Sequence, residues 1–157
     1  MTKNFLEINN VTFAASAQSK VNNVSLTIEN QGDIVCLLGP SGIGKTTILR
    51  TIAGLEKIQS GKIILKNKIL SSDKTHIEPE NRNISMGFQD NSLFPHYTVL
   101  ENIKFGADRN KKKKKGLNLN EINKLLHIEH IADKYPHQIS SGEAQRASLA
   151  RSLLSNP

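Results

Sequence analysis

The sequence has few aromatic residues, one cysteine and no tryptophan. Aromatic residues make up 4% of its 157 residues and none lies among the clustered lysines, so it lacks the stacking platform of a nucleic-acid-binding protein. Cys36 lies in the apolar run Ile34–Leu38, which predicts a small core residue and not a redox group. No apolar run approaches the roughly 20 residues of a membrane span, and the start, MTKNFLEINN, lacks a secretory signal. These absences predict a cytoplasmic protein.

The positive charge is concentrated in one short segment. The net charge is +7, and five of these charges belong to Lys111–Lys115, so the rest of the chain carries +2. A run of like charges is typical of a solvated linker between elements, and this is our interpretation of the segment. The alternative is an electrostatic contact with acidic lipid head groups or RNA.

The most informative segment, GPSGIGKTT, follows the apolar run Ile34–Leu38 directly. It has the phosphate-loop spacing between an expected buried strand and an expected helix, Thr46–Leu55. Glycines allow backbone N–H groups to converge on phosphate oxygens, and the helix N-terminus favours an anion. Lys45 is expected to reach the β- and γ-phosphates of a nucleotide, and the Thr46 hydroxyl to bind Mg²⁺. The candidate phosphate-binding residues are Gly39, Pro40, Ser41, Gly42, Ile43, Gly44, Lys45, Thr46 and Thr47.

The front half of the chain otherwise has the alternating pattern of strands. Strands are expected at Phe5–Ile8, Val24–Ile28 and Ile84–Phe88, separated by polar segments. Gly61–Leu65 and Lys68–Leu70 predict a hairpin with Asn67 in its turn, followed by a polar loop over 71–83.

The second half has the spacing of helices. Thr98–Phe105 is expected to be helical, and Leu119, Ile122, Leu125 and Leu126 fall on one helical face. A further helix is expected from Ser140, which with Glu143 forms a capping box. His127 and His130 share a helical face, but with no third ligand nearby they are interpreted as surface residues.

The phosphate loop alone leaves kinases, GTPases and many ATPases open, and two further segments narrow the choice. MGFQDNSLFPH, residues 86–96, resembles the Q-loop region of ABC transporter ATP-binding subunits. YPHQISSGEAQR, residues 135–146, resembles their signature motif and its lead-in. With the phosphate loop the three motifs occur in the family's order and span nearly the whole chain. The loop at 78–84 and the residues after it look most like the importer branch that handles ferric iron, polyamines or sugars.

The resemblance implies a fold, ligands and partners. The implied fold is α/β: a P-loop NTPase core with an antiparallel β subdomain over residues 1–95, and an α-helical subdomain over 96–157. ATP and Mg²⁺ are the implied ligands, Lys45 and Gln89 the implied catalytic residues, and Thr46 and Gln89 the implied metal contacts. Ser140 and Gly142 would bind the γ-phosphate of ATP held by a second subunit. Asn91–Thr98 would dock a transmembrane permease, which places the protein at the cytoplasmic face of the membrane.

The sequence departs from the family pattern at several positions. Ala15 stands about where an aromatic residue usually stacks on adenine, which predicts similar affinities for ATP and GTP unless Phe13 substitutes. Ser141 replaces the first of two consecutive glycines in the signature. Glu143 replaces the usual glutamine and would bring a negative charge near the γ-phosphate, so we expect a modest weakening of the closed dimer.

The family's second acidic strand and switch histidine do not occur within residues 1–157. The resemblance therefore implies a domain that is incomplete at its C-terminus, as part of an ATP-hydrolysing import subunit. The alternative is a truncated nucleotide-binding module that does not turn over by itself. In either case we expect this chain alone to hydrolyse ATP at no more than a trace rate.

Overall fold

The computed structural model describes residues 4–14, 20–88, 92–107 and 116–157. The chain forms two compact units, residues 1–84 and 85–157, and each is described by itself. The predicted subdomain boundary at residue 95 stays a prediction.

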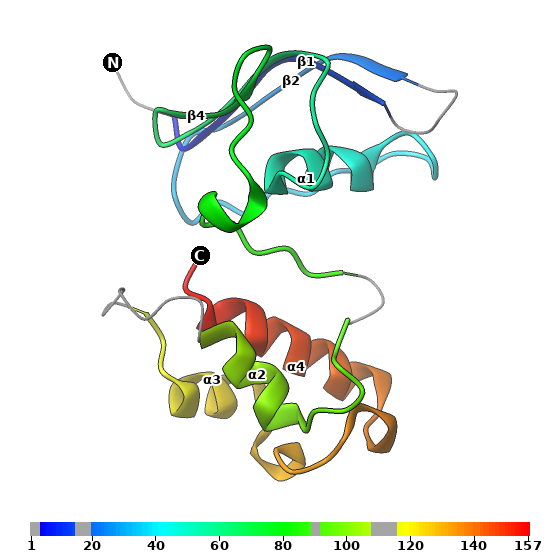
Figure 1. Cartoon of the computed structure of the whole chain (residues 1–157), viewed down its shortest axis with the longest axis vertical. Coiled ribbons are helices and arrows are strands. Elements are labelled where there is room, and N and C mark those ends of the chain that lie inside the picture. Colours follow the sequence, from blue (N-terminus) through cyan, green and yellow to red (C-terminus); the bar gives the residue numbers. More distant parts are fainter. Residues whose placement is uncertain (1–3, 15–19, 89–91, 108–115) are drawn as a thin grey trace. The chain divides into compact units, whose positions relative to one another are not determined.

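The first unit is built on a four-stranded antiparallel sheet of order β2-β1-β3-β4. Its strands are β1 (Leu6–Ala14), β2 (Lys20–Ile28), β3 (Ser60–Leu65) and β4 (Lys68–Ser72). The helix α1 (Lys45–Ala53) lies on one face of the sheet (Figure 1). The predicted strands at 5–8 and 24–28 and the predicted hairpin are confirmed, and β1 and β2 are longer than expected.

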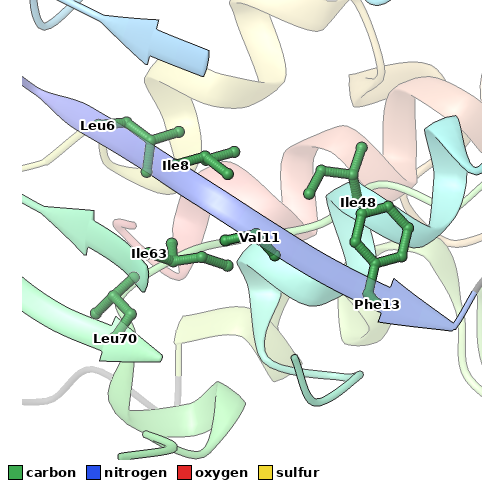
Figure 2. Close-up of a cluster of buried hydrophobic side chains, with 7 residues drawn as sticks. All are labelled: Leu6, Ile8, Val11, Phe13, Ile48, Ile63 and Leu70. Atoms are coloured by element: carbon green, nitrogen blue, oxygen red, sulfur yellow. The ribbon is translucent and has the colours of Figure 1, made fainter. Parts of the chain in front are cut away.

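A bulge in β1 keeps its apolar residues on one face. The pairing with β2 shifts between Ile8 and Val11, and Asn10 has a positive φ of 50°. One extra residue restores the alternation, so that Leu6, Ile8, Val11 and Phe13 are all buried. Figure 2 shows these side chains converging with those of Ile48, Ile63 and Leu70.

The turn between β3 and β4 has the geometry that the sequence predicts. Lys66 and Asn67 both have positive φ, 47° and 65°. Two consecutive left-handed residues are typical of a type I′ turn, whose twist matches that of paired strands. Asn tolerates this conformation, which is why Asn67 marks the turn in the sequence.

Two predicted strands are wrong. Ile34–Leu38 and Ile84–Phe88 have no strand conformation and pair with none of the described strands. Ile34 is 99% exposed, and Cys36 is exposed and not buried as predicted. An apolar run predicts a buried strand only if neighbouring strands and a covering layer are at hand, and neither segment pairs with the described sheet.

The second unit is helical. It contains α2 (Val99–Ala107), α3 (Leu119–Leu126), α4 (Ser141–Leu154) and two single turns, η3 (Glu129–Ile131) and η4 (Pro136–Gln138). Its core combines β-branched residues with two alanines of α4: Val99, Ile103, Ile122, Ile128, Ile131, Ala147 and Ala150. The predicted helices are confirmed, although Leu125 is 62% exposed and does not belong to the α3 apolar face. Among the described residues, no helix is long and apolar enough to cross a membrane.

Candidate nucleotide-binding site

The phosphate loop of the first unit ends in a left-handed turn that only glycine adopts easily. Gly42 has φ 83° and Gly44, the N-cap of α1, has φ 100°. A Cβ on Gly44 would come within 2.9 Å of the Val21 side chain and 3.3 Å of the Phe13 ring. Gly44 therefore supplies both the backbone turn and the close packing that brings the start of α1 against the sheet.

The N-terminus of α1 has the electrostatics of an anion site. No side chain caps it, and no acidic residue lies in its first turn. Ser41 and Gly42 are exposed, so a ligand can reach the loop. The unpaired N–H groups of a first helical turn and the helix dipole both favour a negative charge.

Lys45 bridges the loop in this structure. Its Nζ donates hydrogen bonds of 2.7 Å to the carbonyl oxygens of Gly39 and of Pro40. The ammonium group thus lies at the loop itself and offers a third donor to an anion. Thr46, exposed in the first turn of α1, offers a hard hydroxyl oxygen of the kind that Mg²⁺ accepts. These residues fit a nucleotide phosphate with its metal ion.

The other end of α1 is held by a buried arginine that the sequence analysis placed in a polar loop. Arg82 is 2% exposed and follows the single turn η1 (Pro79–Asn81). Its guanidinium donates to the carbonyls of Thr51 and Ile52 at 3.0 and 2.9 Å, near the end of α1. It also donates to Ile77 O at 2.6 Å and Ser71 Oγ at 2.8 Å, and its Nη2 lies 3.3 Å from His76 Nδ1.

The arginine and Gly54 fit each other closely. Gly54 is the left-handed C-cap of α1, and a Cβ there would overlap the Arg82 guanidinium. Burial lowers the pKa of Arg82, and the charge of Glu78 opposes that shift. Arg82 therefore fixes the C-terminal end of the helix whose N-terminus is the anion site. No spacing in the sequence distinguishes this arginine from a surface one.

In the second unit, α4 begins with the predicted capping box. Glu143 N donates to Ser140 Oγ at 3.3 Å, and Glu143 Oε2 accepts from Ser140 N at 2.8 Å and Ser140 Oγ at 2.7 Å. His130 Nε2 lies 3.1 Å from Glu143 Oε1. The bonds from the Ser140 backbone and side chain, with a smaller contribution from His130, lower the pKa of Glu143 to about 2.

The residues around the start of α4 leave it accessible. Ser140 and Ser141 are exposed, and a Cβ on Gly142 would come no closer than 3.7 Å to Arg146 Nη1. His127 and His130 are exposed, as predicted, and the described residues contain no cluster of three or more potential metal ligands of the His, Cys, Asp or Glu type.

The segment before α2 is organised by a buried asparagine that the sequence analysis did not single out. Asn102 Oδ1 accepts from Phe94 N at 2.7 Å, and its Nδ2 lies within 3.2 Å of the carbonyls of Phe94, Tyr97 and Thr98. The Phe94 ring packs on Phe105 and Tyr97, with centroids 4.8 and 5.6 Å apart. The described part of the predicted docking segment is therefore preorganised. In the sequence, the signal for this role of Asn102 is a single amide side chain among the apolar residues of the expected helix.

The predicted site residues lie in both units. Lys45, Thr46 and Gly39–Gly44 lie together in the first unit, and Ser140 and Gly142 lie together in the second. Ala15, Gln89, Asn91 and the lysine run 111–115 lie outside the described residues. Phe13 is 1% exposed within the sheet core, so it does not offer a face to adenine.

A glycine loop that opens onto α1 is typical of P-loop proteins, and the capping box of α4 lies where the signature motif of ABC transporter ATP-binding subunits is expected. The chain belongs to the ABC transporter family, whose model matches residues 21–157. It is 44% identical over 154 residues to the putrescine transport ATP-binding protein PotG of Escherichia coli K12, covering 97% of this chain and 40% of that protein. It is 41% identical over 162 residues to the Fe(3+) ions import ATP-binding protein FbpC of Escherichia coli O157:H7, covering 99% of this chain and 44% of that protein.

Solved structures agree with the fold. The dimeric structure of MJ0796, a bacterial ABC transporter cassette, has a TM-score of 0.76 and 28% identity, covering 97% of this chain and 70% of that one. A second structure of MJ0796, in a post-hydrolysis state bound to ADP and Pi, has a TM-score of 0.75 over the same coverage. The chain spans 40% and 44% of the length of PotG and FbpC.

Proposed function

We propose that the chain is the nucleotide-binding part of an ABC import subunit, which couples the binding and hydrolysis of ATP to solute uptake. The observation that carries the proposal is the uncapped N-terminus of α1 with Lys45 Nζ on the Gly39 and Pro40 carbonyls. This arrangement supplies a cation and backbone donors to one phosphate group. The family and the names of PotG and FbpC support the importer assignment.

Each predicted site residue has a role in this proposal. The backbone of Gly39–Thr47 and Lys45 would hold the phosphates, and Thr46 with Gln89 would hold Mg²⁺. When bound, Mg²⁺ neutralises charge on the β- and γ-phosphate oxygens. Ser140 and Gly142 would meet the γ-phosphate held by a second copy, an arrangement that the dimeric MJ0796 structure makes reasonable. The segment 91–98 would dock a permease at the cytoplasmic face of the membrane. Iron, polyamines and other solutes remain equal candidates.

The test is calorimetric titration of the chain with ATP in the presence of Mg²⁺. Lys45→Ala should lower the affinity at least ten-fold, because a charge-assisted contact of about 1.5–3 kcal/mol is lost. Lys62→Ala, at an exposed position of β3, is the matched control and should bind like the wild type. Equal ATP affinity of the Lys45 and Lys62 variants would overturn the assignment of the loop. Phosphate release by the chain alone should stay at a trace rate in the same preparation.

A further inference from the structure

The carboxylate of Glu143 is held at both of its oxygens by residues from different segments. Oε2 completes the capping box of α4 with Ser140, at 2.7 and 2.8 Å. Oε1 lies 3.1 Å from Nε2 of His130, which belongs to the turn η3 and not to α4. The capping box alone accounts for the first oxygen. The second contact therefore requires a separate explanation.

The donor in this second contact is the histidine. The pKa of Glu143 is lowered to about 2, so the group is ionised at any neutral or mildly acidic pH and can only accept. His130 must therefore carry a proton on Nε2, either as the neutral tautomer or as imidazolium. Its side chain is 61% exposed while that of Glu143 is 20% exposed, so the histidine lies on the solvent side of the carboxylate.

The charge of Glu143 is in an unfavourable place for the proposed function. It lies in the first turn of the helix whose start, with Ser140 and Gly142, is the expected site for an anionic phosphate. Because the carboxylate stays ionised near neutral pH, its position relative to the phosphate depends on the donors that hold its two oxygens. Arg146 lies one turn further on, but among the described residues the ion pair of Glu143 is with His130.

We propose that His130 is a positioning residue of the signature site, which directs the Glu143 carboxylate through its Nε2 contact so that the start of α4 can accept a phosphate presented by a second copy. The inference rests on the proposed function. Glu129 and Asp133, on the same segment, are the other acidic groups next to His130 in sequence, and neither forms an ion pair with it in the described structure. In the described structure, the carboxylate in contact with His130 is that of Glu143.

The experiment measures the ATP-driven association of the chain by analytical ultracentrifugation, with circular dichroism as a check on folding. His130→Ala should weaken association about three-fold, the scale of an exposed ion pair. His130→Lys should restore it, since a hydrogen-bond donor returns to the same place. Glu143→Gln keeps the cap but has no charge. In this background, His130→Ala should not change the association. His127→Asn is the matched control, because Asn tolerates the left-handed backbone at that exposed position.

The outcomes separate the two proposals. An equal loss in the wild-type and Glu143→Gln backgrounds would mean that His130 acts through structure and not through the carboxylate. If the wild type associates and His130→Ala associates equally well, the inference is overturned and the proposed function stands. A wild-type chain that binds ATP but does not associate would overturn the inference alone, and one that binds no ATP would overturn both.

Discussion

At the scale of single residues, the phosphate loop depends on glycine for two separable reasons. Gly44 and Gly32 have nearly the same φ, 100° and 102°. A Cβ on Gly44 would meet Val21 at 2.9 Å, whereas a Cβ on Gly32 would have nothing within 4 Å. A comparison of the two glycines therefore separates the cost of backbone strain from the cost of a steric clash.

We expect Gly32→Ala to lower the free energy of unfolding by about 1 kcal/mol, the cost of a left-handed L-residue. Gly44→Ala should cost about 1–3 kcal/mol more, since the clash with Val21 adds to the strain. Urea denaturation followed by circular dichroism measures both values. Equal losses in the two variants would show that the loop moves freely away from the sheet.

Arg82 has a structural role that no pattern in the sequence indicates. It donates to three backbone carbonyls and one hydroxyl, including those of Thr51 and Ile52 in α1. Arg82→Lys keeps the charge but not the planar fork, so most of these acceptors lose their partner. We expect a loss of about 3 kcal/mol in the free energy of unfolding.

A matched control for Arg82 is Arg50→Lys. Arg50 forms an exposed ion pair with Glu56, with side-chain exposures of 40% and 45%, and its replacement should cost less than about 1 kcal/mol. Both variants are measured by the same denaturant titration. Similar losses in the two variants would contradict the structural role assigned to Arg82.

At the scale of elements, local chemistry predicted the helices and the hairpin correctly, whereas two strands predicted from apolar runs are absent from the described structure. Capping boxes, C-terminal glycines and a type I′ turn depend on residues close in sequence, so Ser140–Glu143, Gly54 and Asn67 could be identified directly. A strand at 34–38 or 84–88 depends on hydrogen-bond partners far along the chain. The candidate phosphate loop could be identified because its residues are contiguous in sequence, whereas Arg82 and Asn102 act through contacts that only the fold brings together.

The cap of α4 makes a pH prediction. The folded pKa of Glu143, about 2, lies below the unfolded value, so its stabilisation is complete above the unfolded pKa and is lost as the pH falls through the folded pKa. We expect the protection factors of the amides at the start of α4, which compare the observed with the intrinsic exchange rate, to fall between about pH 4.5 and 2, while Glu143→Gln shows no such step there.

Nuclear magnetic resonance measures this exchange residue by residue. Thr98 and Glu101 form a similar box at the start of α2, which also lowers the pKa of Glu101. This box is the internal control, because the amides at the start of α2 should respond to pH independently of α4. A step at α4 that persists in Glu143→Gln would assign the transition to another group.

At the scale of the whole molecule, the charge is distributed unevenly. Five lysines at 111–115 account for most of the net charge of +7. The phosphate site itself contains one cation, Lys45, close to loop carbonyls. If the protein's overall field attracted nucleotide, removing the run would lower the association rate; if the local donors dominate, it would not.

We expect the local donors to dominate, because Lys45 and the backbone donors of the loop lie at the candidate site itself. Replacing Lys111–Lys115 by a Gly/Ser segment of equal length should leave the ATP affinity within two-fold of the wild type in calorimetric titration. Replacement by glutamates, which reverses the charge, is the sharper control and should also change the affinity little at physiological salt. A large loss in the Gly/Ser variant would mean that the run packs on the site. A loss confined to the glutamate variant, and growing as the salt is lowered, would mean instead that the net charge of the chain governs nucleotide capture.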